Sequence, residues 1–158
     1  MSVQRIKAEL AAFKRQEKKS EDIQLEFCEN QINKLVGMIK GPPDTPYAGG
    51  WYELSIEIPD TYPYTPPKVK FVTRVWHPNV SSVTGAICLD ILSTAWSAAL
   101  RIDKVLLSIQ VLLSCPEPDD PQDAVVAKQY KNDFKLFNDT AREWVTKYAS
   151  ANPVKSIG

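Results

Sequence analysis

HPNVSSVTGAICLD, residues 77–90, is the stretch around which the rest of the chain is organised. It contains the single histidine of the sequence, an asparagine directly after a proline, and a cysteine between two aliphatic residues. Regular hydrophobic periodicity stops near Val72 and resumes near Ile102, so this stretch lies inside a long irregular segment. Long ordered loops in compact domains usually carry function. We therefore expect the reactive groups in this segment and the scaffold on either side of it.

The chain before this stretch predicts one helix followed by four strands. Residues 2–18 predict an amphipathic helix, because apolar residues recur at spacings of three and four along one face. That face consists of Val3, Ile6, Leu10 and Phe13. Alternation of apolar and polar residues then predicts strands at 23–28, 34–40, 51–59 and 68–72. The short connections between these strands favour an antiparallel meander.

The chain after this stretch predicts three helices. Residues 103–113 are apolar over more than half of the helix surface, which is typical of a central, buried helix. Residues 122–131 and 133–148 predict two further helices, the last of which packs through Phe134, Phe137, Ala141, Trp144 and Tyr148. The pattern predicts one α+β domain over residues 1–150 and a short tail at 151–158.

The composition of the 158 residues excludes several classes of protein. Nineteen basic and nineteen acidic residues give no net charge, so neither a nucleic-acid nor a membrane surface is expected. No apolar run approaches the roughly 18 residues of a membrane helix, and MSVQRIKAEL lacks the apolar core of a signal peptide. One histidine and no CxxC pair make a structural metal improbable. We expect a protein of the cytoplasm, with the nucleus as a second location.

Cys88 is the candidate nucleophile. Cys28 lies in a predicted strand and Cys115 closes a predicted helix, so both suit simple packing, and three widely spaced cysteines do not indicate a disulfide framework. Cys88 instead lies in the irregular segment beside Gly85, with no adjacent Lys or Arg. The carboxylate of Asp90, two residues on, would raise the pKa of the thiol. Such a thiol suits an acyl group that arrives already activated as a thioester.

Two neighbours of Cys88 have more than one interpretation. His77 is the only candidate base for a Cys–His hydrolase, but the proline behind it restricts its backbone, and a structural hydrogen bond is the favoured interpretation. The amide of Asn79 could donate to an oxyanion, or the residue could serve the conformation of a turn.

Four motifs in order along the chain resemble the ubiquitin-conjugating enzyme family. They are YPYTPPKVKF at 62–71, HPNVSSVTGAICLDIL at 77–92, Trp96-Ser97, and PEPDDPQDAVVAKQY at 116–130. The agreement runs from about Arg5 to Tyr148. Residues 81–92 and 116–127 are similar to the 25-kilodalton type, whose members carry a ubiquitin-associated helical domain after the catalytic one. The resemblance implies an N-terminal helix, a four-stranded antiparallel sheet and three further helices.

The resemblance also implies a reaction. Cys88 would accept the C-terminal carboxyl of ubiquitin from the cysteine of the activating enzyme and pass it to a lysine amine, usually with a ligase. Asn79 matches the residue that steadies the oxyanion or its surrounding loop, and Asp120 matches the acidic residue that orients the lysine or assists its loss of a proton. His77 matches a residue that shapes the active-site loop. No cofactor is implied for this chain, because ATP is consumed upstream by the activating enzyme.

The resemblance places the partner surfaces as well. Tyr64, Ser97 and Ala98 fall where the family contacts ligases, beside Arg5 on the first helix, where the activating enzyme docks. Trp96 is interpreted as loop packing. Many relatives have proline where this chain has Ala98, so the set of ligases is expected to differ.

A second departure lies close to Cys88, where Glu117 stands in place of the asparagine of several relatives. Two rival functions are considered beside the conjugating enzyme: a catalytically silent scaffold that binds ubiquitin or another conjugating enzyme, and a cysteine hydrolase that uses Cys88 and His77. The presence of Cys88 with Asn79 and Asp120 argues against the scaffold. No Lys or Arg lies next to Cys88 along the chain to lower the pKa of its thiol, and the proline after His77 restricts the backbone of the histidine. Both features argue against the hydrolase.

Overall fold

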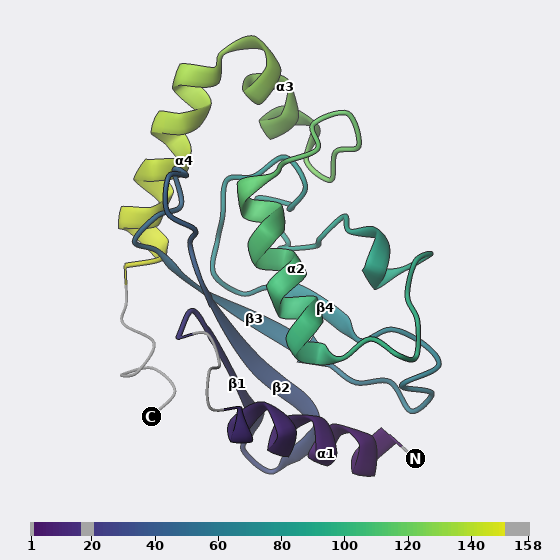
Figure 1. The fold of residues 1–158 in the computed structure, drawn as a ribbon. Helices are drawn as coiled ribbons and strands as arrows, with labels where there is room; N and C mark the ends of the chain where they lie inside the picture. The colour runs from purple at the N-terminus through teal and green to yellow at the C-terminus, as the bar shows by residue number, and fades with distance from the viewer. Residues whose placement is uncertain (1, 17–20, 151–158) are drawn as a thin grey trace.

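The computed structural model describes residues 2–16 and 21–150, and it has four α-helices and one four-stranded sheet in these ranges (Figure 1). The elements are α1 (Ser2–Arg15), β1 (Ile23–Cys28), β2 (Gln31–Lys40), β3 (Trp51–Glu57), β4 (Lys68–Phe71), the short 3-10 helix η1 (Asp90–Leu92), α2 (Ile102–Ser114), α3 (Ala124–Asn132) and α4 (Phe134–Tyr148). The strand order β1-β2-β3-β4, with every pair antiparallel, confirms the predicted meander. The predicted tail at 151–158 lies outside the described residues.

The helix α2 packs across one face of the sheet and forms the centre of the core (Figure 1). Four apolar residues of this core are completely buried: Leu54 and Ile56 of β3, and Leu106 and Ile109 of α2. Their burial agrees with the predicted strand at 51–59 and the predicted central helix at 103–113. At Gly37 of β2, an added Cβ would lie 3.0 Å from the Leu106 side chain of α2. A side chain at this position would require Leu106 to shift by a few tenths of an ångström.

Several predicted boundaries shift by a few residues. The strand β2 begins at Gln31 rather than at 34, because a bulge at Phe27/Cys28 and a positive φ of 62° at Asn30 make a tight turn that lengthens the pairing. The first helix ends at Arg15 rather than at 18, and residues 17–20 lie outside the described ranges. The third helix begins at Ala124 rather than at 122, because the side chain of Asp123 accepts a hydrogen bond from Val126 N and caps it.

Two residues predicted to face the core are exposed. Val3 is 40% exposed and Phe134 is 51% exposed, although the Phe134 ring still packs on Tyr130 and Phe137. Both lie in the first turn of their helices. Ile6 and Phe137, the next residues of the two predicted faces, are buried as predicted.

Glu9 of α1 joins three separate parts of the fold. Its Oε2 accepts hydrogen bonds from Arg5 Nε (2.9 Å) and from the Tyr62 hydroxyl (2.5 Å), and its Oε1 accepts from the backbone N–H of Ile102 (2.8 Å), the first residue of α2. Only 8% of the Glu9 side chain is exposed. Burial and the neighbouring Glu9 raise the pKa of Tyr62, so its hydroxyl remains a donor.

Replacing Glu9 by alanine should therefore destabilise the protein by about 3 kcal/mol, because it leaves buried donors on Tyr62 and Ile102 without an acceptor. The free energy of unfolding in urea measures this loss. The matched control is Glu26→Ala, which removes an ion pair with Lys14. This pair lies at the surface, because the Lys14 side chain is 49% exposed and the Glu26 side chain is 45% exposed. The control should change the free energy by less than about 1 kcal/mol. Equal losses for the two variants would contradict the role of Glu9.

Within residues 2–16 and 21–150, none of the helices combines the length and the apolar character that crossing a membrane requires. The same residues contain no group of three or more His, Cys, Asp or Glu side chains placed to hold a metal ion.

Candidate active site

Cys88 lies on a segment that is tethered to the edge of the sheet. The bridge between Lys70 and Ala86 attaches the segment to β4, and the Cys88 N–H donates to Asn79 O at 2.9 Å. Gly85 has a φ of 80°, and an added Cβ there would lie 2.0 Å from Phe71 O. Only glycine allows this close approach, so the position of Cys88 is set by backbone contacts on both sides.

The thiol of Cys88 is partly exposed and faces a carboxylate. Its Sγ donates to Oδ2 of Asp120 at a distance of 3.7 Å. Burial raises the pKa of Cys88, and the charge and hydrogen bond of Asp120 and the charge of Glu117 raise it further. The predicted direction is confirmed, but the carboxylate responsible is not Asp90, which accepts from the N–H of Ile91 at 2.8 Å; it is Asp120, which the family resemblance implied at the site. Spacing along the chain could not reveal a neighbour that is 32 residues away.

The side chain of Asn79 holds the loop that carries both acidic neighbours of Cys88. Its Oδ1 accepts from Glu117 N (2.8 Å), and its Nδ2 donates to Glu117 O (3.0 Å) and Asp120 O (2.9 Å). Asn79 is 1% exposed. Of the two interpretations left open by the sequence, this geometry supports the loop, because both amide hydrogens are already donated to backbone carbonyls.

His77 is a structural residue in this geometry. It is completely buried, its Nδ1 accepts from Asn79 N at 3.0 Å, and its Nε2 lies 2.8 Å from Leu112 O. These partners require a neutral ring with the hydrogen on Nε2, which donates to Leu112. With both nitrogens engaged in the interior, the ring is not available as the base of a hydrolase, and the predicted structural interpretation is supported.

The burial of His77 has a measurable consequence at low pH. Burial lowers the pKa of His77 from its ordinary value of 6.5 to about 4, although the hydrogen bond to Leu112 acts in the opposite direction. Because the unfolded chain takes up this proton first, the contribution to stability is complete above pH 6.5 and is lost as the pH falls toward 4.

The contribution of His77 to the free energy of unfolding should fall by about 2 kcal/mol between pH 7.5 and pH 5. NMR titration of the single imidazole measures its pKa directly, without overlap from other histidines. A midpoint near 6.5 in the folded protein would contradict the assignment.

Removing the charge of Asp120 should make Cys88 more reactive toward a simple electrophile. Asp120→Asn lowers the pKa of the thiol, so alkylation of Cys88 by iodoacetamide at pH 8 should be faster than in the unchanged protein. The matched control is Asp119→Asn, because Asp119 forms an ion pair with Lys131 and is not among the groups that act on the thiol. Peptide mass spectrometry resolves alkylation at each cysteine. Equal rates in both variants would contradict the role of Asp120.

The four predicted partner residues divide into two kinds. Tyr64 is 83% exposed, and Ser97 and Ala98 lie on the neighbouring irregular segment with Ser97 exposed. Arg5 is engaged within the protein, because its Nη2 donates to Ala98 O (2.8 Å) and Leu100 O (3.1 Å). Trp96 packs on Tyr62 and donates to Pro63 O at 2.9 Å, which confirms loop packing.

Asp123 supports the site and was missed by the sequence analysis. Its Oδ2 accepts from both N and Oγ of Ser82, at 2.9 and 2.7 Å, while its Oδ1 caps α3. Burial alone would raise the pKa of Asp123, but these hydrogen bonds lower it. An acidic residue just before an apolar helix is a capping signal that could have been recognised, whereas its second partner could not.

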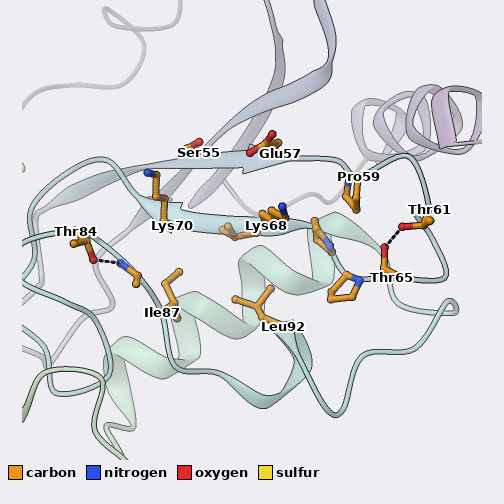
Figure 2. A pocket seen from close by; sticks show the side chains of 14 residues that line it. Ser55, Glu57, Pro59, Thr61, Thr65, Lys68, Lys70, Thr84, Ile87 and Leu92 are labelled. Carbon is orange, nitrogen blue, oxygen red and sulfur yellow. Dashed lines mark hydrogen bonds between the residues drawn. The ribbon is translucent and has the colours of Figure 1, made fainter.

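A groove of about 850 Å³ lies between β4 and residues 84–92 (Figure 2). One wall carries Lys68 and Lys70 of β4, and the other carries Ile87 and Leu92. The lining residues do not include Cys88. The thiol is instead partly exposed at its contact with Asp120.

Comparison with known proteins identifies the class. A model of the family described as ubiquitin-conjugating enzyme matches residues 5–145, and the chain belongs to that family. It is an E2 ubiquitin-conjugating enzyme, a transferase that acts through a cysteine thioester. Membership implies ubiquitin, an activating enzyme and ligases as partners in general.

Individual relatives confirm the predicted type. The chain is 55% identical over 157 residues to human "Ubiquitin-conjugating enzyme E2 K", covering 99% of this chain and 78% of that protein. It is 54% identical over 150 residues to "Ubiquitin-conjugating enzyme E2-22 kDa" of Drosophila melanogaster, covering 94% and 75%. The solved E2 domain of a Toxoplasma gondii ubiquitin-conjugating enzyme is 47% identical and superposes with a TM-score of 0.88, covering 94% of this chain and 99% of that one.

Proposed function

We propose that Cys88 is the residue that carries ubiquitin and that Asp120 receives the lysine. The observation that supports this most strongly is the placement of the Cys88 thiol 3.7 Å from the Asp120 carboxylate on an open surface. Cys28 lies within β1 and Cys115 follows the last turn of α2, and neither has such a partner among the described residues.

Loading is a thioester exchange. The Cys88 sulfur attacks the carbonyl carbon of the thioester on the activating enzyme, a new C–S bond forms, and the old C–S bond breaks to release the first thiol. The exchange replaces one thioester by another, so it is nearly balanced in energy and requires no strong base. The raised pKa of Cys88 is compatible with this step, because the carbonyl arrives already activated.

Transfer is an aminolysis. A lysine amine attacks the carbonyl carbon, the C–N bond forms, the C–S bond breaks, and the amine gives up a proton while Cys88 regains its thiol. The Asp120 carboxylate lies at the sulfur and is placed to orient the amine or to take up this proton. No cofactor is needed in either step, and ATP is consumed upstream by the activating enzyme.

The proposal for a ligase surface is supported by the family resemblance and by the exposure of Tyr64 and Ser97. We propose that Tyr64, Ser97 and Ala98 contact ligases, and that Arg5 acts by holding the backbone of residues 98 and 100 in position. Ala98, which stands where many relatives have proline, would then alter the surface that contacts the ligase.

A charging assay tests the assignment of Cys88. Incubation with activating enzyme, ATP and ubiquitin should give an adduct that is stable without reductant and is lost with it. Cys88→Ala should abolish the adduct, and Cys88→Ser should leave a more persistent ester, because an oxyester exchanges more slowly than a thioester.

The matched controls are Cys28→Ser and Cys115→Ser, which should both form the adduct as the unchanged chain does. Circular dichroism confirms that each variant is folded. A folded, unchanged protein that forms no adduct would support the silent scaffold instead, and an adduct that survives Cys88→Ala would place the reaction on another cysteine.

A further inference from the structure

Glu117 is held on a rigid support beside Cys88. Proline residues flank it at 116 and 118 and restrict the backbone on both sides. Its N–H and its carbonyl are both bound by the side chain of Asn79, whose own carbonyl accepts the N–H of Cys88. Asp120 N also donates to Glu117 O at 3.1 Å. A single buried residue therefore fixes the backbone of Glu117 relative to the thiol.

The Glu117 side chain itself is free. It is exposed, and among the described residues its carboxylate makes no hydrogen bond or ion pair. Its acidic neighbours differ, because Asp119 pairs with Lys131 and Asp123 binds Ser82 and caps α3. The fold thus uses the backbone of Glu117, while its carboxylate is exposed to solvent and accessible to an approaching molecule.

The charge of Glu117 reaches the reacting sulfur. It is one of the groups that raise the pKa of Cys88, after burial and Asp120. A lysine acceptor has an ordinary pKa near 10.4 and so arrives as a cation at neutral pH. Two carboxylates that act on the same sulfur attract this cation, whereas they have little effect on a neutral acceptor.

We propose that Glu117 is a specificity-determining residue that draws cationic amine acceptors to the Cys88 thioester. This inference rests on the proposed function of Cys88. Glu117 lowers the KM for charged acceptors through attraction, while Asp120 acts on the amine during transfer. The substrate class it favours is a lysine in basic surroundings, because neighbouring positive charges add to the attraction.

Discharge of a preformed thioester tests this inference. The unchanged chain and Glu117→Gln are first loaded with ubiquitin, and the activating enzyme is then stopped. Each thioester is chased with cadaverine, which carries two positive charges, with 6-aminohexanoate, which offers a similar amine on a zwitterion, and with hydroxylamine, which is neutral at pH 7.5.

Glu117→Gln should raise the KM for cadaverine about three- to tenfold at 0.05 M salt and leave kcat unchanged, in keeping with one long-range charge interaction. The effect should be smaller for 6-aminohexanoate and absent for hydroxylamine. In about 1 M salt, where the screening length is about 3 Å, the difference for cadaverine should vanish. Glu117→Asp keeps the charge and should restore the preference.

The matched control is Glu29→Gln, which removes an exposed carboxylate from the turn between β1 and β2 and should change none of these rates. A similar loss with all three acceptors would show a structural role for Glu117 and overturn the inference, as would an unchanged KM for cadaverine. If the unchanged chain cannot be loaded, the assignment of Cys88 fails and this inference fails with it. Normal loading with unchanged acceptor preference overturns the role of Glu117 alone.

Discussion

The candidate active site depends on one buried amide. Asn79 joins two segments that are about forty residues apart, because its side chain binds the backbone of Glu117 and Asp120 while its carbonyl binds the N–H of Cys88. A buried amide with all its hydrogen bonds made is costly to disturb. The loop that carries the acidic groups therefore keeps a fixed position against the sulfur without any direct covalent or metal link among the described residues.

The raised pKa of the Cys88 thiol is compatible with accepting an acyl group that is already activated as a thioester and passing it on. Hydrolases lower the pKa of their cysteine with a cation or an imidazolium to make a strong nucleophile. Here burial and two carboxylates raise the pKa of Cys88, and the only histidine is neutral and buried. A thiol with a raised pKa is a weak nucleophile toward ordinary amides, because little of it is in the thiolate form at neutral pH. The carboxylates that weaken the thiol are suited to attract and orient a lysine, so one arrangement serves both selectivity and transfer.

Several residues of reactive or charged type serve the scaffold. His77 ties residues 77–79 to the end of α2, Glu9 ties α1 to Tyr62 and α2, and Arg5 holds the backbone at 98 and 100. The sequence left a catalytic base as the less favoured role of His77, and the family resemblance implied partner binding for Arg5. Burial and the hydrogen-bond partners decide between these uses, and both depend on segments that are distant along the chain.

The sequence by itself determined the meander, the central helix and the candidate sulfur, because periodicity and motif order are local properties that survive in any compact packing. Segment boundaries were less accurate at β2, α1 and α3, where a bulge and a cap decide the ends. The family resemblance implied Asp120 at the site and left two roles for Asn79. Only the tertiary structure decided that Asp120 faces Cys88, that Asn79 holds the loop, and that the Glu117 carboxylate has no partner among the described residues. These facts depend on contacts between residues 79, 88, 117 and 120, and no local pattern encodes which distant groups meet.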